Sequence, residues 1–448
     1  MPAIIALAWP TMLEQLLHTA VQYIDTAMVG SLGTDATAAV GATTTVNWLI
    51  GSTVSALGVG FLAFISQSLG AKDKDLAVRA SSQSVLITLI VGVFFTVATL
   101  LLSPVVPSLM QVDTSIRDLA AKYFFILYTP MLFRSASIIF GSILRAAGDS
   151  KTPMRVGLAV NLINVALNFI LIYPTRSLVI GGREITVLGA DMGVLGAAAA
   201  SAVAYAVGGI VITVALFRHK VISPGRIALK LDKEVLKPCL KVALPNMLQR
   251  FGTSLGYVAF ASMINALGEI ATAAHTIANT VESAFYIPGY GMQAAAATLT
   301  GNAMGAGDRQ RIKDLAIILN VIEITLMIVS GGLLFIFAPD MMTIFSKDAE
   351  VIALGSTVLK MVALSEPVYG VSIIIEGMLQ GQGNTKTPFK FNIIGMWGIR
   401  IVGTFICTSL LGLGLVSAWG CMIAHNVLLF VMFTIYYKKK LTDRKSGL

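Results

Sequence analysis

Charged residues are scarce in this sequence: Asp, Glu, Lys and Arg make up 12% of its 448 residues, against about 25% in an average soluble protein. A chain of this length needs more charge than that to cover a water-facing surface. A soluble globular enzyme and a disordered chain are therefore excluded. The hydrophobic residues, 56% of the total, occur in long runs without the alternation of membrane β-strands, so the sequence predicts a polytopic α-helical membrane protein.

Cysteine and histidine are scarce as well. The three cysteines are scattered in or beside hydrophobic runs, where cysteine is typically a small core residue: Cys239, Cys407 and Cys421. No pair of histidines has the spacing of metal ligands, so we predict neither a disulfide nor a cysteine–histidine metal site. We expect His18 and His275 to form hydrogen bonds within the helices and His425 to belong to the core.

The sequence also lacks the signals of secretion and of nucleotide or nucleic-acid binding. The first residues contain no basic segment and no cleavage site, so we expect no cleavable signal peptide. Residues 148–153 and 383–388 lack the spacing of a phosphate-binding loop and are typical of turns between helices. The net charge of +9 comes from short basic clusters between hydrophobic runs, as in cytoplasmic loops, which argues against a nucleic-acid partner.

Hydrophobic runs long enough to cross a bilayer, which takes about 20 residues, are marked off along the chain by turn and charge signals. We predict membrane-spanning helices near residues 9–31, 38–69, 76–102, 117–145, 154–173, 190–217, 238–266, 272–303, 312–338, 350–380, 389–411 and 413–437. Several of these runs are longer than a bilayer requires, so we expect them to tilt, bend or extend beyond the membrane.

Basic residues set the expected orientation. If both termini are cytoplasmic, most Lys and Arg fall in the cytoplasmic connections, above all in residues 218–241 and the C-terminal tail. The outer connections then hold only Arg117, Lys122, Arg176, Arg183 and Lys347. Four further basic residues lie inside the predicted helices: Arg134, Arg250, Lys360 and Arg400. This asymmetry predicts a multi-pass protein of a prokaryotic inner membrane with both termini in the cytoplasm.

The chain repeats itself at a constant offset of 235 residues. Three separated motifs recur in this way: residues 9–14 and 244–249, 68–71 and 303–306, and 144–153 and 379–388. The repeat holds six predicted helices, and an even number of spans gives both copies the same orientation, which places their pseudo-twofold axis along the membrane normal. Secondary transporters built from such repeats bind substrate between the copies, and a duplicated scaffold or receptor without transport is the alternative.

We therefore predict an all-α integral membrane protein with twelve transmembrane helices in two pseudo-twofold-related six-helix lobes. Its expected parts are a first lobe at 1–217, a basic cytoplasmic linker at 218–237, a second lobe at 238–438 and a basic cytoplasmic tail at 439–448. With no nucleotide site, the energy for transport has to come from an ion gradient.

Asp25 is the most informative polar residue, because it lies deep in the first predicted helix with no Lys or Arg within one turn. An ionisable group in the bilayer costs roughly 2.5–3.5 kcal/mol to insert. Its counterpart at the repeat offset is Phe260, so the charge belongs to the first lobe alone. Hydrocarbon disfavours the charged form, which suits this carboxyl to take up and release a proton. The alternative is a carboxylate hydrogen-bonded to neighbouring hydroxyls for packing.

Three asparagines, Asn161, Asn164 and Asn168, share one face of the helix predicted at 154–173, because their spacings are 3 and 4. Amides are poor lipid-facing groups, so this face should turn toward the lobe interior. Their oxygens could ligate Na⁺, and their NH₂ groups could hold a deprotonated Asp25. Hydrogen bonding between helices is an equally good interpretation.

The repeated motifs resemble those of the multidrug and toxic compound extrusion (MATE) transporters. The resemblance covers both halves of the chain and rests mainly on residues 23–30, 67–73, 144–153, 302–308 and 379–388. It implies a twelve-helix, two-lobe exporter that expels amphiphilic, often cationic compounds in exchange for H⁺ or Na⁺.

The resemblance also implies an ion site. Ser201 stands where the family often places a threonine hydroxyl, so the family site maps onto Asp25, Asn164, Asn168 and Ser201, with Na⁺ held by the first three. Some members carry Asp where this chain has Asn168. The loss of that second carboxylate weakens a two-carboxylate proton scheme and leaves a sodium site open.

The second lobe contains several ionisable residues within predicted helices. The candidates for a second substrate or ion site are Glu282, Glu366, Glu376 and Arg400. Because acids and bases, Arg250 among them, occur inside one lobe, we expect internal ion pairs, with structural roles for the two arginines. For Glu282, helping to bind a cationic substrate is an alternative role.

We therefore predict a monomeric secondary active exporter, not an enzyme, whose partners are organic cations or amphiphiles and the lipid bilayer. Its 19 Met and 21 Phe fit an adaptable apolar cavity. A flippase for lipid-linked oligosaccharides ranks second, because it needs a wide basic cavity and few basic residues lie within the helices. A non-transporting membrane scaffold is the third candidate.

Overall fold

The computed structural model describes residues 2–110, 112–180, 183–225 and 230–442. Helices dominate these residues, in the order α1 (Pro2–Gly30), α2 (Thr34–Gly70), α3 (Lys74–Leu102), α4 (Val106–Leu109), α5 (Arg117–Tyr128), α6 (Met131–Ala146), α7 (Lys151–Leu171), α8 (Gly193–Phe217), α9 (Lys233–Asn265), α10 (Glu269–Gly305), α11 (Arg309–Phe345), α12 (Ala349–Ala363), α13 (Glu366–Gly381), α14 (Lys386–Ile393), α15 (Val402–Phe405) and α16 (Leu415–Thr442). Two π-helical stretches, η1 (Ile394–Ile401) and η2 (Ile406–Leu410), continue the span that α14 begins.

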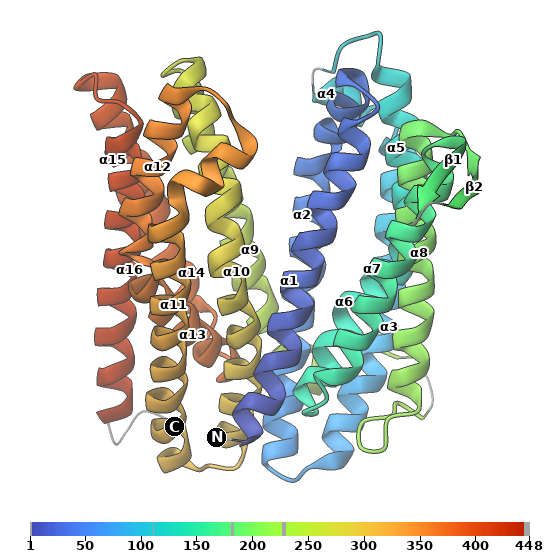
Figure 1. The fold of residues 1–448 in the computed structure, drawn as a ribbon. Coiled ribbons are helices and arrows are strands. Elements are labelled where there is room, and N and C mark those ends of the chain that lie inside the picture. Colours follow the sequence, from blue (N-terminus) through green and yellow to red (C-terminus); the bar gives the residue numbers. More distant parts are fainter. Residues whose placement is uncertain (1, 111, 181–182, 226–229, 443–448) are drawn as a thin grey trace. The chain divides into compact units, whose positions relative to one another are not determined.

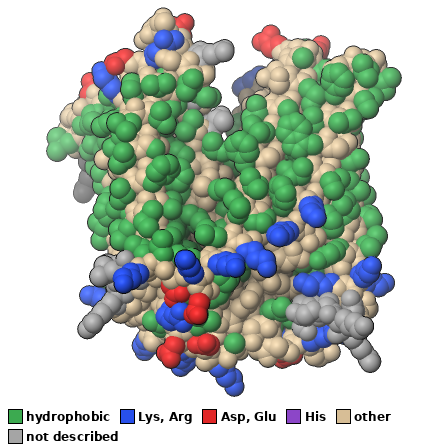
Figure 2. All heavy atoms as spheres, turned by 180° about the vertical axis from the view of Figure 1, so that it is seen from behind, with side chains coloured by type: hydrophobic (Ala, Val, Ile, Leu, Met, Phe, Trp, Pro, Cys, Tyr) green, Lys and Arg blue, Asp and Glu red, His purple; other side chains and the backbone are tan. Residues whose placement is uncertain are grey.

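The predicted all-α membrane fold is confirmed. Eight described helices are long and hydrophobic enough to cross a membrane, and two bent helix pairs bring that number to ten. Helices α9 and α10 complete the twelve predicted spans. Their hydropathy is lower because polar residues lie within both helices, among them Gln249 and Arg250 in α9 and His275 and Glu282 in α10. On the face drawn in Figure 2, hydrophobic side chains cover most of the surface and charged side chains gather mainly toward its ends.

Two predicted single helices are broken at equivalent positions of the repeat. The chain bends by 49° between α5 and α6 and by 53° between α12 and α13. The breaks fall at 129–130 and 364–365, which are 235 residues apart. Pro130 precedes α6 and Pro367 lies in the first turn of α13, and proline cannot continue the hydrogen bonding of a preceding helix. The repeat therefore includes this bend as well as its helices.

A β-hairpin between α7 and α8 is the one described element that departs from an all-α fold. Strand β1 (Pro174–Ile180) pairs antiparallel with β2 (Arg183–Ala190), and the register shifts between Pro174 and Arg176. This segment was expected to be an outer connection followed by a helix from residue 190. Figure 1 shows the hairpin projecting beside α8, which begins only at Gly193.

The described chain forms two compact units. The N-terminal unit contains Leu16–Phe61 and Lys74–Leu236, and the C-terminal unit contains Met1–Gln15, Leu62–Asp73 and Lys237–Leu448. The units differ from the predicted lobes in one respect: the first half of α1 and the last turns of α2 belong with the C-terminal residues. The change of unit along α9 falls at Lys237, the last residue of the expected linker.

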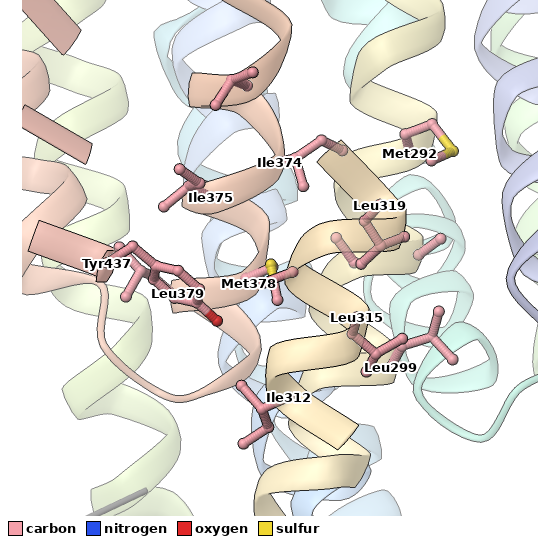
Figure 3. Close-up of a cluster of buried hydrophobic side chains, with 14 of the residues drawn as sticks. Met292, Leu299, Ile312, Leu315, Leu319, Ile374, Ile375, Met378, Leu379 and Tyr437 are labelled. Atoms are coloured by element: carbon pink, nitrogen blue, oxygen red, sulfur yellow. The ribbon is translucent and has the colours of Figure 1, made fainter. Parts of the chain in front are cut away.

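The core of the C-terminal unit explains why the start of α1 belongs to it. Buried residues of α10, α11, α13 and α16 pack together, among them the labelled side chains of Figure 3. Ile4, Leu7 and Ala8 of α1 are part of the same cluster. The Thr11 hydroxyl also donates to the carbonyl of Gly291 in α10 at 2.8 Å. Figure 1 accordingly shows the N-terminus and the end of α16 at the same end of this unit.

Glycines of the repeated motifs let helices of the C-terminal unit touch backbone to backbone. A Cβ on Gly70 would strike the backbone of Asn302, and a Cβ on Gly305 would strike the backbone of Gln67. The two contacts are the same contact seen from each copy of the repeat, because 67 and 302, like 70 and 305, are 235 residues apart. Small residues at such crossings allow the close approach that membrane helices use for packing.

Candidate functional site

The second half of α1 brings Asp25 against α7 within the N-terminal unit. The Asn168 amide nitrogen donates to Asp25 Oδ1 at 2.6 Å, and both Asn164 and Asn168 are buried. The end of α1 is fixed to the segment that follows α7, because the Tyr173 hydroxyl contacts the Ser31 hydroxyl at 2.9 Å and donates to the Met28 carbonyl at 3.3 Å. The asparagine face thus turns toward Asp25, as the spacing predicts.

Asn164 links Asp25 to α8. In the amide orientation that satisfies both of its ends, the Asn164 nitrogen donates to Asp25 Oδ1 at 2.8 Å and to Oδ2 at 3.1 Å, and its oxygen accepts from Ser201 Oγ at 3.0 Å. Helix α8 comes close to the end of α7 at Gly196, which has no Cβ. A Cβ at this position would collide with the backbone of Leu171. Ser201 therefore orients the amide that holds the carboxyl.

Two amide donors aimed at Asp25 favour its carboxylate form, because hydrogen bonds to a charged acceptor are stronger than neutral ones. One acceptor in the cluster has no donor: the Asn168 oxygen is enclosed and forms no hydrogen bond in the described part of the chain. A cation or a proton on Asp25 is the kind of group that such an oxygen accepts. Oxygens of Asp25 and Asn168 are the atoms that fit Na⁺, and the Asn164 oxygen points to Ser201 instead.

Asn161 lies on the same helix face without joining the cluster. It is half-buried, and it forms no hydrogen bond with Asp25 or Asn164. It lies about one turn nearer the start of α7 than Asn164. The spacing of the three asparagines predicts that they share one face of α7. It does not predict which of them lies level with Asp25 of α1.

In the C-terminal unit, Glu376 is held by three amides. The Gln249 nitrogen donates to its Oε1 at 2.8 Å, the Gln380 nitrogen to the same oxygen at 3.1 Å, and the Asn392 nitrogen to Oε2 at 3.0 Å. A carboxylate in this setting is satisfied by neutral donors from α9, α13 and α14. Glu376 is therefore a structural junction between helices, separate from the other acids of this unit.

Glu282, Glu366 and Glu323 form a group of neighbouring buried carboxyls on α10, α13 and α11. Glu366 interacts electrostatically with both of the others. Glu323 is fully enclosed, neither of its oxygens has a hydrogen-bond partner among the described residues, and Glu366 Oε2 has none either. Sequence analysis did not select Glu323, although its position between Ile322 and Ile324 in a hydrophobic run is the same signal that marks Asp25.

No direct ion pair forms in the C-terminal unit among the described residues, although Arg250 interacts electrostatically with Glu376, and Arg400 with Glu282. Arg400 donates from Nη2 to the Met422 sulfur at 2.9 Å, and its guanidinium lies over the rings of Phe260 and Tyr257 at 4.3 and 4.9 Å. Arg250 donates to the Asn246 oxygen at 3.0 Å. Aromatic faces and neutral acceptors are therefore the direct contacts of these two guanidinium groups.

Two of the histidine predictions are confirmed. His275 accepts a hydrogen bond at Nδ1 from the Trp419 indole at 3.2 Å. His425 is buried beside Gly395, and neither of its ring nitrogens has a partner in the described ranges. Neither histidine belongs to the Asp25 cluster or to the group of three glutamates.

Comparison with known proteins relates the whole chain to one family. The MatE family profile matches residues 10–170 and again 245–406. The chain is 26% identical to the probable multidrug resistance protein NorM of Thermotoga maritima, covering 99% of this chain and 94% of that protein. It is also 26% identical to the probable multidrug resistance protein YoeA of Bacillus subtilis, covering 97% and 94%.

Solved structures have the same fold. A crystal structure of MATE in the straight conformation matches with a TM-score of 0.89 and 24% identity, covering 98% of this chain and 96% of that one. A crystal structure of MATE in the bent conformation matches with a TM-score of 0.88 and 23% identity, covering 98% and 95%.

Proposed function

Because the chain belongs to the MatE family, the family of the MATE transporters, we propose that it is a secondary active exporter that expels amphiphilic organic cations in exchange for H⁺ or Na⁺. The names of its relatives, which are multidrug resistance proteins, support the substrate class. The same names disfavour the flippase and the scaffold.

The observation that carries the proposal is the Asp25 cluster. A single carboxyl inside a membrane unit is held by amide donors of Asn168 and Asn164, and one enclosed amide oxygen beside it has no donor. Such a carboxyl binds a monovalent cation or a proton with little rearrangement. Binding of the coupling ion therefore involves one small group of atoms on α1, α7 and α8.

Ion binding changes which hydrogen bonds hold α1 to α7. When Asp25 is a carboxylate, both asparagine nitrogens donate to it and fix the second half of α1. When a proton occupies one of its oxygens, the carboxyl becomes neutral and these bonds weaken. The second half of α1 is then free to repack. Under alternating access, we propose that this repacking expels the substrate from the N-terminal unit.

The residues fit Na⁺ as well as H⁺. The Asp25 oxygens and the Asn168 oxygen would hold a sodium ion, and rotation of the Asn164 amide would add a further oxygen at the loss of its bond to Ser201. When bound, the ion would neutralise the carboxylate as a proton does. Loss of a second carboxylate at position 168 is compatible with either ion, because both carry a single charge.

We also propose a second ion or organic-cation site in the C-terminal unit at Glu282 and Glu366, with Glu323 as a third carboxyl. Both oxygens of Glu323 and Oε2 of Glu366 have no hydrogen-bond partner among the described residues, which supports this assignment. Glu376 stands outside it, because three amides satisfy its carboxylate, whereas Arg400 acts electrostatically on Glu282 and borders this site. We expect both termini in the cytoplasm, since the basic connections lie on their side.

Ethidium efflux from proteoliposomes, driven separately by an imposed pH gradient and an imposed Na⁺ gradient, tests the proposal. We expect one of the two gradients to drive efflux by the wild-type protein. Asp25→Asn should abolish that response while the protein stays in the membrane, and Asp118→Asn, which removes an exposed carboxylate of α5, should leave it unchanged. Full gradient-driven efflux by Asp25→Asn would refute the coupling role of Asp25.

A further inference from the structure

Two of the three cysteines meet in the C-terminal unit. Cys407 lies in η2 and Cys421 lies in α16, and their sulfurs are 3.8 Å apart. Both are free thiols with half-buried side chains. Because the two residues belong to different helices, sequence spacing alone does not predict that they are neighbours. The pair is also separate from the groups to which we assign ion coupling.

A glycine allows the two helices to approach closely at this point. Gly403 lies about one turn before Cys407, and a Cβ on it would lie 3.1 Å from the Cys421 sulfur and 3.6 Å from Cys421 Cβ. Cys421 therefore packs directly against the backbone of the span that carries Cys407. A disulfide needs Cα atoms about 4.4–6.8 Å apart, which only closely packed segments provide. Rotation of the two side chains can then bring the sulfurs into bonding distance.

The turn between the two helices keeps the cysteines near each other. The Leu413 nitrogen donates to the Cys407 carbonyl at 2.8 Å, and the Leu411 nitrogen donates to the Ile406 carbonyl at 3.0 Å. Gly412 has a φ of 66°, a conformation that glycine adopts at little cost. The connection from η2 to α16 is thus short and hydrogen-bonded to the turn that contains Cys407.

The surroundings of the pair favour a bond between the sulfurs over a structural zinc site. Structural zinc is held by four protein ligands. Among the described residues, no group of three or more His, Cys, Asp and Glu side chains is arranged to hold a metal ion. The third cysteine, Cys239, is buried in α9. Two neighbouring thiols are therefore all that this place offers, and their characteristic chemistry is oxidation to a disulfide.

We propose that Cys407 and Cys421 form a reversible dithiol–disulfide site that hydrogen peroxide oxidises. One sulfur attacks a peroxide oxygen and the O–O bond breaks, which gives a sulfenic acid and one water that takes up the thiol proton. The other sulfur then displaces the sulfenic oxygen as a second water and forms the S–S bond. The two thiols lose two electrons and two protons, and one peroxide is reduced to two waters. Peroxide is small and uncharged, so it reaches half-buried thiols of a membrane protein.

The site lies near one end of its two helices. Cys421 is six residues after the start of α16, about 9 Å along the helix, and Cys407 is four residues before the connection at 411–414. With both termini in the cytoplasm, as we expect, this connection faces the outer side, where disulfides persist. The closed disulfide would tie the π-helical stretch η2 to α16.

Counting free thiols in the purified protein tests the site. Protein reduced with dithiothreitol is treated with hydrogen peroxide, denatured and labelled with a maleimide–polyethylene glycol reagent, which shifts its gel mobility once for each free thiol. The chain has three cysteines, so we expect three labels before peroxide, one after it and three again after renewed reduction. Mass spectrometry of the oxidised monomer should find the peptides of Cys407 and Cys421 joined, with the loss of two hydrogen atoms.

Cys239→Ser is the matched control, and it should carry two labels before peroxide and none after it. Cys407→Ser should carry two labels both before and after, because its remaining cysteines are not neighbours. Three labels on peroxide-treated wild type would overturn the proposal, and so would joined peptides found only in a covalent dimer. Equal loss of labels from wild type and Cys407→Ser would show that the thiols react separately, which also overturns it. If Cys407→Ser does not fold, the joined peptide in wild type and in Cys239→Ser still decides.

Discussion

Gly70 and Gly305 make one reciprocal contact, in which each glycine lies against the backbone of the residue three positions before the other. A Cβ on Gly70 would overlap Asn302, and a Cβ on Gly305 would overlap Gln67. The repeated motifs that contain these glycines therefore contact each other through equivalent positions of the two copies of the repeat. Backbone atoms form the obstacle, so no side-chain rotation can relieve the overlap.

Alanine at either glycine should destabilise the protein by a similar amount. We expect Gly70→Ala and Gly305→Ala each to lower the free energy of unfolding by about 1–3 kcal/mol, as overpacking of a close contact does. Gly332→Ala is the control, because no heavy atom lies within 4 Å of its Cβ position. Thermal unfolding in detergent measures all three. Equal melting temperatures for Gly70→Ala and wild type would show that the helices separate at no cost.

Removing the Asn168 amide should impair coupling more than removing the Asn161 amide. Asn168 donates to Asp25 at 2.6 Å, and a hydrogen bond to a charged group contributes about 1.5–3 kcal/mol. We therefore expect Asn168→Ala to reduce gradient-driven ethidium efflux about tenfold or more. Asn161→Ala should retain efflux close to the wild-type rate. Equal losses in the two variants would mean that the whole asparagine face acts as a packing surface.

The start of α9 should be held to α3 in a manner that depends on pH and salt. Arg79 donates to Asp232 Oδ2 from Nε at 3.0 Å and from Nη2 at 2.6 Å, and it also pairs with Glu234 at 2.7 Å. The hydrogen bonds from Arg79 hold the pKa of Asp232 below its usual value. A carboxyl with a lowered pKa in the folded state adds stability above its unfolded pKa, and that stability is lost as the pH falls through the folded pKa.

Arg79→Gln should consequently lower the melting temperature slightly at neutral pH, since exposed ion pairs contribute about 0.2–1 kcal/mol. The difference from wild type should shrink below about pH 4, where the carboxyl takes up its proton. It should also shrink in about 1 M salt, which screens exposed charges. Melting curves across pH and salt check this. A difference that stays constant under all these conditions would assign the effect to packing.

Glu323→Met should stabilise the C-terminal unit. Glu323 is fully enclosed and both of its oxygens lack partners in the described residues, and an unsatisfied buried polar group costs about 1–3 kcal/mol. Methionine has a similar volume and no such group. We expect a higher melting temperature for Glu323→Met, and no change beyond about 0.5 kcal/mol for Glu350→Met on the exposed start of α12. A lower melting temperature for Glu323→Met would indicate that the carboxyl binds a partner in solution.

The sequence predicted the parts of the fold that depend on hydropathy and on repetition. The twelve spans and the doubling of the chain follow from run lengths and from a constant offset, both of which are local properties. The hairpin of β1 and β2 was missed because its segment is short and lies between two strong helix signals. The division of α1 at Gln15 was also missed, because no residue in an unbroken hydrophobic helix marks where its packing partners change.

The candidate site was predictable where one residue stood out against its surroundings. Asp25 was found because a lone acid in a hydrophobic run is conspicuous, and Asn164 and Asn168 because helical spacing puts them on one face. Arg250 and Arg400 lie within electrostatic reach of Glu376 and Glu282, but the sequence does not reveal that an amide oxygen and aromatic rings form their direct contacts.

The assignment of Ile4, Leu7 and Ala8 to the core of the C-terminal unit has a consequence for biosynthesis. A fragment that begins at Lys237 lacks these side chains, and it also lacks the end of α2 that carries Gly70. The first half of the chain holds all of the residues of the N-terminal unit, but the second half does not hold all of the residues that the C-terminal unit uses. The C-terminal unit can therefore complete its core only with segments that leave the ribosome first, and a chain split in the linker should regain its fold only when both fragments are expressed together.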